Sequence, residues 1–399
     1  MSKPVKLTTQ NTYGQLFDAL FAKECATKCP AYAACGGHRL SAPCGCAWPT
    51  SSGKRHKCEE CSLNCRERTK TGLNGSEPDS IPHLNAGSLL DQVMVQQNSE
   101  IRLPLFIPTK TEFLKDSDTL SALRWAAADM GTLFNMKGTI SHFATRQSSQ
   151  KYLRVGPECN LIAVLNGKDN RLERFWEMKR GTILKQLHDS GFSIGTGATF
   201  SVTDVTEKGT PMPYFHNATM LMRHHRVVQE IQVAGMEAVP NIYWIDKDQK
   251  EIQRWAEWLM KNPGIRIVSR DFTSTRNKHT VMSKLYELVS LLNTVGRSFH
   301  VMIVGTGIKI APLVLRELAK AGHFGSIVTS APIQLAYRNA RYRLGDNNQI
   351  FTEKCTDRSV PFSDLMRHNM EIFEQALFDA VAGTPAEHKA LSNVLLSEF

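Results

Sequence analysis

The chain has 399 residues, of which 42% are hydrophobic and 22% charged, and its formal net charge is +10. This composition is that of an ordinary globular protein. No apolar run reaches the roughly 18 residues that a membrane span needs, and the N-terminal "MSKPVKLTTQNTYGQLF" lacks the apolar centre of a signal peptide. We therefore expect a cytoplasmic protein without a membrane partner.

Residues 1–70 form the first predicted unit, a cysteine-rich module. Because cytosolic thiols stay reduced, crowded cysteines indicate metal binding more than disulfides, and a segment with so few apolar residues needs a metal in order to fold. Four thiolates complete one site, so eight predict about two zinc ions. An iron–sulfur cluster is the alternative, and which cysteines share a metal stays open. The predicted ligands are Cys25, Cys29, Cys35, Cys44, Cys46, Cys58, Cys61 and Cys65.

The same module is basic. It carries eleven Lys and Arg residues against five Asp and Glu residues, a net +6 and more than half of the excess of the whole chain. A basic, metal-folded module beside a more neutral domain suggests an anionic partner, with nucleic acid, either DNA or tRNA, as the first candidate. A solvated basic surface without a partner is the alternative.

Residues 71–99 are predicted to be a linker, since their first part is rich in Gly, Pro, Ser and Asn. From 100 to 345 strands alternate with helices, and 346–399 is predicted to be a C-terminal helical extension. The expected strands are 101–108, 160–169, 192–204, 236–246, 265–272, 299–307 and 325–332. The expected helices are 118–134, 171–191, 216–235, 248–264, 280–296 and 310–322. Repeated strand–helix units indicate an α/β fold with a parallel sheet.

Two architectures fit such a pattern, a closed (β/α)8-like TIM barrel and an open doubly wound sheet. No G-x-G-x-x-G follows the first strand, which favours the barrel over the nucleotide-binding open sheet. In a barrel, active groups gather at the carboxyl ends of the strands. At those ends we take Asp204 and Asp271 as candidate catalytic carboxylates, with helix capping as the alternative.

Further candidates for substrate binding lie at the same strand ends. The glycines of "VGTG" allow a ligand to approach the backbone before a helix, and "YRNARYRLG" combines arginine and tyrosine as nucleic-acid-binding segments do. Cys159, by contrast, is expected to pack in the core, and "RHHR" (223–226) to form a solvated basic helix face. The substrate-binding candidates are Asn166, Asn241, Gly305, Gly307, Ser330, Arg338 and Arg341.

The segment "FHVMIVGTGIKIAPLVLRELAKAGHFGSIVTSAPIQLAYRNARYRLG" (299–345) resembles the late barrel of the tRNA-guanine transglycosylases and of their relatives that insert 7-deazaguanine into DNA. "VGTG" matches the family's glycine turn, and Pro332 with "RNAR" (338–341) matches the family's residues after the next strand. Val328, Thr329 and Ser330 stand where the family's nucleophilic aspartate would fall, and "DSGG" is absent. The family's zinc site follows its barrel, whereas the cysteines here precede it. Residues 192–246 also resemble uncharacterised TIM-barrel proteins of phages and mobile elements.

The resemblance and the basic module together predict an enzyme that modifies nucleic acid, by base exchange of the transglycosylase kind on a base in DNA or tRNA. In this hypothesis the cysteine module holds phosphates, and Asp204 or Asp271 attacks or deprotonates at a flipped base. The alternatives are a non-catalytic nucleic-acid-binding protein of a mobile element or defence system, and an iron–sulfur redox enzyme.

Overall fold

The computed structural model describes residues 93–110, 123–134, 140, 142–202, 214–244, 249–275, 277–345, 349–356 and 359–394. The predicted cysteine module and all but the end of the predicted linker lie outside these ranges. Within them the fold is mixed α/β with parallel sheets, as the strand–helix alternation predicts. No helix among the described residues combines the length and the apolar character needed to cross a membrane.

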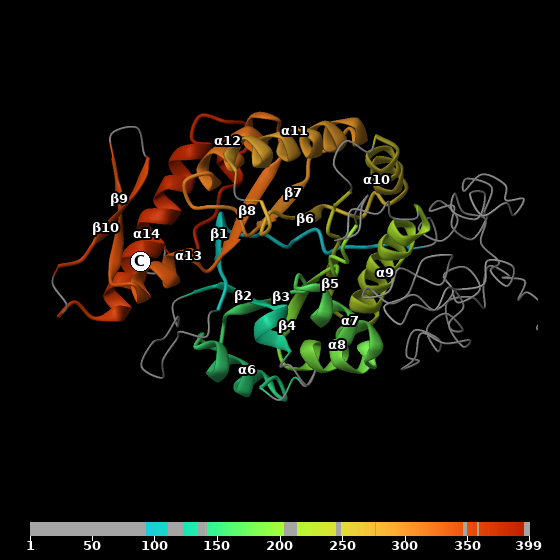
Figure 1. The fold of residues 1–399 in the computed structure, drawn as a ribbon, viewed down its shortest axis with the longest axis horizontal. Coiled ribbons are helices and arrows are strands. Elements are labelled where there is room, and N and C mark those ends of the chain that lie inside the picture. The colour runs from blue at the N-terminus through green and yellow to red at the C-terminus, as the bar shows by residue number, and fades with distance from the viewer. Residues whose placement is uncertain are drawn as a thin grey trace, which may run out of the picture.

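Two four-stranded parallel sheets form the centre of the molecule (Figure 1). One has the order β2-β3-β4-β5, with β2 Trp125–Asp129, β3 Asn160–Val164, β4 Phe192–Thr196 and β5 Glu237–Val239. The other has the order β1-β8-β7-β6, with β1 Phe106–Pro108, β8 Phe324–Thr329, β7 His300–Val304 and β6 Ile267–Asp271. Within β2 to β5 and within β6 to β8, strands that follow one another in sequence are neighbours in the sheet, whereas β1 pairs with β8. Each connection between such neighbours is a crossover, which makes the pairs parallel.

Helices cover the outer faces of both sheets (Figure 1). On the side of β2 to β5 lie α5 Met130–Leu133, α6 Arg146–Leu153, α7 Asp169–Glu177, α8 Arg180–Asp189 and α9 Tyr214–Val233. On the other side lie α10 Gln249–Lys261, α11 Lys278–Val295, α12 Ala311–Lys320, α13 Ala331–Tyr337 and α14 Phe362–Val381. A short 3-10 helix, η3 Glu387–Lys389, follows α14.

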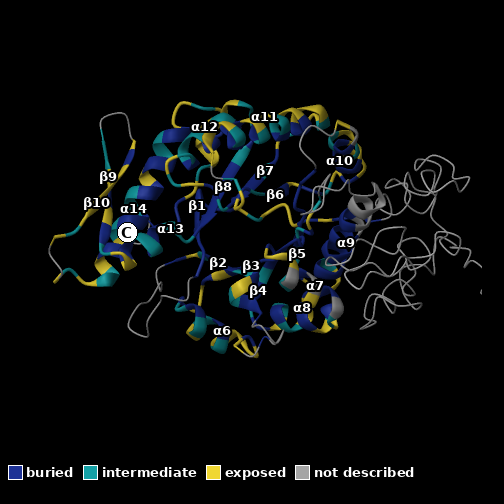
Figure 2. Ribbon diagram, viewed as in Figure 1, coloured by how far each residue is buried: buried dark blue, intermediate teal, exposed yellow. Residues whose placement is uncertain are grey.

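The apolar core has two parts. The larger part lies between the strands and the helices, and Figure 2 shows the buried helix faces turned toward the sheets. The smaller part lies between the two sheets and draws on all eight of the parallel strands described. Because the strands are buried on both faces, they are almost continuously apolar. The strand residues of the smaller part are Ile107, Ala127, Ile162, Val164, Ile194, Val239, Ile267, Met302, Val304 and Val328.

At the β5/β6 junction, one of two places where the sheets meet, a side-chain amide joins the strands. Gln97 is 3% exposed. Its Nε2 donates to the carbonyls of Ala238 (2.8 Å) and Ile267 (2.9 Å), and its Oε1 accepts from the N–H groups of Arg266 and Ile267, both at 2.7 Å. Nearer the carboxyl ends, Asn241 and Ser269 pair as an isolated parallel bridge. The Gln97 amide therefore satisfies backbone groups where the two strands diverge.

The β1/β2 junction has the same construction. Asn393 donates from Nδ2 to the carbonyls of Phe106 (3.1 Å) and Trp125 (2.8 Å), and its Oδ1 accepts from the N–H groups of Arg124 and Trp125, both at 3.0 Å. Thr109 and Ala127 form the isolated bridge nearer the carboxyl ends. The last described residues of the chain thus close this junction.

The buried carboxylate of Glu374, on α14, holds this C-terminal segment in place. It accepts hydrogen bonds from the Ser392 hydroxyl (2.7 Å) and from the N–H groups of Asn393 (2.6 Å) and Val394 (2.9 Å). The predicted C-terminal extension is therefore an integral part of the strand assembly.

Three sequence predictions were wrong in detail. The helix expected over 118–134 contains β2, whose alanines are buried and paired along β3; burial on both faces overrides alanine's helix propensity. The helix expected over 171–191 is two helices, α7 and α8. On either side of the expected boundary at 345, β9 Ala340–Leu344 and β10 Ile350–Lys354 pair as an antiparallel hairpin.

Candidate functional site

Two of the predicted binding residues meet beyond the carboxyl ends of β3, β4 and β5. The Asn241 Nδ2 donates to Asn166 Oδ1 (2.7 Å) and to the carbonyl of Gly197 (2.5 Å), and it lies 2.9 Å from Thr199 Oγ1. The Thr199 hydroxyl in turn donates to Asn166 Oδ1 (3.2 Å). Residues up to 75 positions apart in sequence thus form one uncharged hydrogen-bonded cluster, called here the amide network.

Ser269 and His224 complete the amide network. The Ser269 hydroxyl, on β6, donates to Asn241 Oδ1. The Asn241 N–H donates to His224 Nε2 at 3.0 Å. Burial, and secondarily the charge of His225, holds the pKa of His224 well below its ordinary value. His224 is therefore neutral and carries its proton on Nδ1.

These contacts fix the orientation of both amides. The Gly197 carbonyl can only accept, so the NH2 of Asn241 must face it and the Asn241 oxygen must face Ser269. Asn166 must then turn its oxygen to Asn241 and its NH2 the other way. That NH2 is buried and has no hydrogen-bond partner among the described residues. Leaving such a group unpaired costs roughly 1–3 kcal/mol, so this NH2 is an unsatisfied donor at the edge of the amide network.

The expected solvated face at "RHHR" is a wrong prediction. Arg223, His224, His225 and Arg226 are all at most 4% exposed, because α9 is packed against α8, β4 and β5. The His225 ring stacks on Trp255 with centroids 4.9 Å apart. Aromatic side chains thus take the place of solvent around these polar residues.

Gly197 is required where the chain passes His224. A Cβ built at Gly197 would collide with the His224 ring and with Val228. The "GTG" of residues 195–197 therefore permits the close approach that brings α9 against the amide network.

Asp271, the described member of the two candidate catalytic carboxylates, ends β6 and is partly exposed. Its Oδ1 accepts from the Thr273 N–H (2.7 Å) and from the Thr273 hydroxyl. Two residues earlier on the strand, and so on the same face, stands Ser269 of the amide network. Asp271 thus lies roughly 7 Å along the strand from that network. Asp204 lies outside the described residues.

The other predicted strand-end residues have identifiable local roles. Gly305 adopts φ +77°, and an added Cβ would lie 2.6 Å from Thr273 Oγ1, so the turn after β7 touches the turn that holds Asp271. The Gly307 carbonyl accepts from the first turn of α12, and the Ser330 hydroxyl accepts from Gln334 Nε2 (2.7 Å). The Thr306 hydroxyl is buried without a partner among the described residues.

Arg338 and Arg341 are not part of this cluster. Arg338 is exposed at the end of α13. Arg341 lies on β9, outside the eight parallel strands (Figure 1), with its Nε 3.4 Å from Glu353 Oε2. The structure therefore separates the "RNAR" arginines from the predicted strand-end residues.

Several residues near the strand ends were missed by the sequence analysis. Thr199, Ser269 and His224 belong to the amide network, and the alternation of β6 could have revealed Ser269 as an inward polar residue. Lys110, just after β1, is 8% exposed, with its Nζ 4.3 Å from the centroid of the Tyr152 ring. Burial, followed by the charge of Arg154, lowers the pKa of Lys110.

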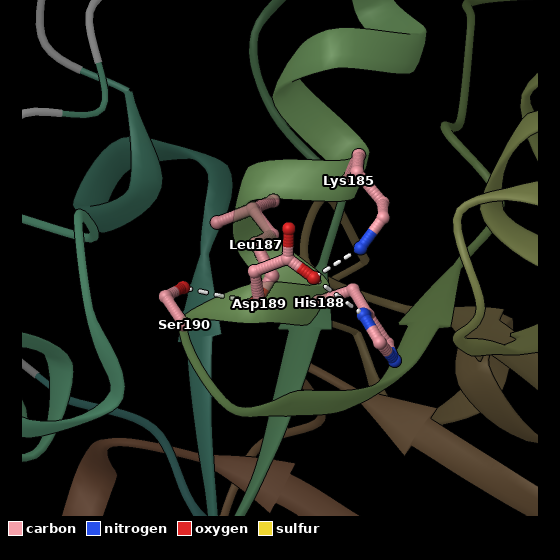
Figure 3. A network of polar contacts seen from close by, with 5 residues as sticks. All are labelled: Lys185, Leu187, His188, Asp189 and Ser190. Atoms are coloured by element: carbon pink, nitrogen blue, oxygen red, sulfur yellow. Dashed lines mark hydrogen bonds and ion pairs between the residues drawn. The ribbon is translucent and has the colours of Figure 1, made fainter.

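A separate pocket of about 630 Å³ opens at the amino ends of β2 to β5, away from the amide network, with Trp125, Asn160, Phe192 and Glu237 among its lining residues. His188 also lines it, and Figure 3 shows Asp189 beside that ring, with the Lys185 ammonium on the same carboxylate oxygen. The hydrogen bonds from Lys185 and then His188 lower the pKa of Asp189. These contacts are exposed, so they contribute little to stability.

Among the described residues no group of three or more His, Cys, Asp or Glu side chains is placed to hold a metal ion. The eight predicted cysteine ligands lie outside the described ranges. Cys159 is 2% exposed, and burial raises its pKa to about 12, which confirms the expected packing role and disfavours a nucleophile.

No protein-family model matches the chain, and no curated protein matches it either. We therefore infer the function from the geometry of the amide network and its surroundings.

Proposed function

We propose that the eight parallel strands form the wall of one (β/α)8-like barrel. Three observations support this: β1 pairs with β8, the two sheets touch at the β1/β2 and β5/β6 junctions, and an apolar cluster from all the parallel strands described lies between them. The amide network then stands at the carboxyl end of the barrel, where barrel enzymes carry their active groups.

We further propose that the protein is an enzyme that modifies nucleic acid and binds a single base at the amide network. The observation that carries this proposal is the buried, unpartnered NH2 of Asn166, held in one orientation by Asn241. Neutral donors and acceptors in a buried site suit the edge of an uncharged planar base, and enzymes that act on bases read a flipped base by such hydrogen bonds. Since Asn166 offers donors only, it would meet an acceptor such as a ring carbonyl.

Asp271 supplies the chemistry in this proposal, which is base exchange. Its carboxylate would attack the sugar carbon, forming an ester bond as the glycosidic bond breaks and its electron pair leaves with the base. A ring nitrogen of an incoming base would then lose its proton, displace the carboxylate and restore the glycosidic bond. The departed base takes up one proton, so the exchange consumes neither water nor a net proton. The Thr273 hydrogen bonds to Oδ1 hold the carboxylate in position. Asp204 is the second candidate for this role.

The cysteine module has a supporting part in the proposal. Its eight cysteines are a sufficient donor set for about two zinc ions, which would fold the module, and its net positive charge would hold phosphates of DNA or tRNA. Metal analysis of the full chain tests this part. About two zinc ions per chain are expected, and iron with sulfide would favour the redox alternative instead.

The test of the enzymatic proposal is incorporation of a radiolabelled base into tRNA and into DNA by the full chain. Asp271→Asn is expected to reduce incorporation by roughly 1,000-fold or more, as losses of a covalent nucleophile do. Asp364→Asn, at an exposed position on α14, is the matched control and should leave it unchanged. Full incorporation by Asp271→Asn would remove Asp271 from the mechanism, and no incorporation by the wild type would contradict base exchange.

A further inference from the structure

The β9–β10 hairpin presents a basic and aromatic face away from the strand assembly. Arg341 and Arg343 are exposed, whereas Tyr342 between them is 5% exposed, so the two arginines share the outer face of the hairpin. Phe351 is directly opposite Arg343 in the register and is 42% exposed. An aromatic ring this exposed beside an arginine has no role in the core.

Basic residues outnumber acidic ones along the hairpin. The sequence from 337 to 356 contains three arginines and one lysine against two acidic residues, Asp346 and Glu353. Glu353 is paired with Arg341 at 3.4 Å, and both side chains are about half exposed, so this ion pair is weak and open to exchange. The local excess of positive charge suits a polyanion.

The hairpin is held rigidly on α14. The Asn369 Oδ1 accepts from the Tyr342 N–H (2.7 Å), and the Asn369 Nδ2 donates to the carbonyls of Ala340 (3.0 Å) and Pro332 (3.3 Å). At its base, Asn339 and Cys355 are joined by a backbone hydrogen bond of 2.9 Å. These contacts hold the backbone of the hairpin, so a ligand on the outer face would not have to order that backbone, which lowers the entropic cost of binding.

We propose that the outer face of the β9–β10 hairpin is a binding surface for single-stranded nucleic acid. Arg341 and Arg343 contact consecutive phosphates, and one base stacks on Phe351. Paired basic and aromatic side chains of this kind bind single strands with little dependence on sequence. The inference rests on the proposed function for the identity of the polymer, and it goes beyond it by giving the strand a second contact outside the barrel.

The test is the affinity of the full chain for a fluorescein-labelled single-stranded 20-mer, measured between about 50 and 200 mM salt. Arg341→Ser/Arg343→Ser removes two phosphate contacts, so the slope of log K against log salt should become less steep by about 1.4. Phe351→Ser should weaken binding by about tenfold with an unchanged slope, because stacking carries no counterion release. Lys185→Ser/Lys320→Ser removes the same charge from exposed positions elsewhere and should change neither quantity.

Three outcomes would overturn the proposal. The first is a hairpin variant that matches the control variant in both affinity and slope while the wild type binds; base exchange would then stand without this surface. The second is a wild type that binds vesicles with anionic lipids but does not bind the 20-mer, while Arg341→Ser/Arg343→Ser does not bind the vesicles. The partner would then be a membrane surface. The third is a wild type that binds no oligonucleotide at any salt, which would contradict the proposed function as well. Thermal unfolding of each variant establishes that it is folded.

Discussion

At both the β5/β6 and the β1/β2 junction a buried side-chain amide joins the two strands, yet only the β5/β6 junction carries the amide network. In each, a buried amide satisfies four hydrogen bonds with the two diverging strands, from Gln97 in one and from Asn393 in the other. Beyond each amide the two strands pair as an isolated bridge, through Ile242 N–H to Ser269 O at one junction and through Lys110 N–H to Ala127 O at the other. The bridge residues differ in their own N–H groups: that of Asn241 donates to His224 Nε2, whereas that of Thr109 donates to the Thr329 carbonyl next to β1.

This difference shows where a side-chain network can form beside a strand junction. Beyond Val239 the pairing of β5 with β4 ends, and polar side chains gather around Asn241 in place of backbone partners; one of them, Asn166, has an NH2 without a partner among the described residues. At the β1/β2 junction the N–H of Thr109 still pairs with the backbone of Thr329, so the junction is made without a network.

The largest expected effect is on the closure itself. Asn393→Ala and Gln97→Ala would each remove four hydrogen bonds to backbone groups, and we expect each to lower the free energy of unfolding by about 4 kcal/mol. Urea unfolding measures this. Asn98→Ala, at an exposed neighbour of Gln97, should cost less than about 1 kcal/mol. A cost equally small for Gln97 or Asn393 would show that the junctions do not depend on their amides.

Acid should weaken the helix that supports the β5/β6 junction. Burial lowers the pKa of His225, on the helix that supports Asn241, to about 4. Above about pH 6.5 the ring is neutral in both states and stability does not depend on it. Between about pH 6.5 and pH 4 only the unfolded state binds the proton, so the free energy of unfolding falls by about 1.4 kcal/mol per pH unit as pH drops.

The measurement is the difference in unfolding free energy between wild type and His225→Gln across this pH range. The variant should lose less stability than the wild type as pH falls toward 4, by roughly 3 kcal/mol in total. His279→Gln, at an exposed position, should follow the wild type. Parallel pH curves for wild type and His225→Gln would contradict a buried neutral His225.

A smaller effect should separate the β1/β2 junction from the other. Glu374→Gln leaves one acceptor oxygen for three donors, and we expect it to lower the free energy of unfolding by about 2 kcal/mol. It should also raise the rate at which carboxypeptidase removes residues up to Asn393, since the C-terminal segment loses hydrogen bonds to residue 374. Glu371→Gln, one turn earlier on α14, is the control. Equal proteolysis of both variants would show that Glu374 does not hold the segment.

The sequence was sufficient for the elements whose pattern is local. Strong periodicity and capping signals predicted α9 to α12, and the polar residues that follow buried strands placed Asn166 and Asn241 at strand ends as binding candidates, without predicting their contact. The α/β class with parallel strands is confirmed, whereas the closed barrel and its enzymatic role stay proposals. β2 was missed because "WAAAD" is equally compatible with a buried helix until its pairing with β3 is known.

Other features depend on contacts far apart in sequence, and no local pattern reports them. Asn393 meets Trp125 across 268 positions and Gln97 meets Ile267 across 170, so neither amide could be assigned to a junction beforehand. The burial of His224 and His225 likewise results from the helices and strands packed around α9. The hairpin was missed because the exposed β10, "IFTEK", has few apolar residues.

The most decisive measurement is the dissociation constant of a nucleobase with a ring carbonyl, such as hypoxanthine or uracil, for the full chain. Asn166→Ala and Asn160→Ala change the same residue type at opposite ends of β3. We predict that Asn166→Ala weakens binding by about tenfold, as the loss of one buried hydrogen bond would, and that Asn160→Ala leaves it unchanged. Equal affinities for wild type and Asn166→Ala, or no binding by the wild type, would contradict a base-binding amide network.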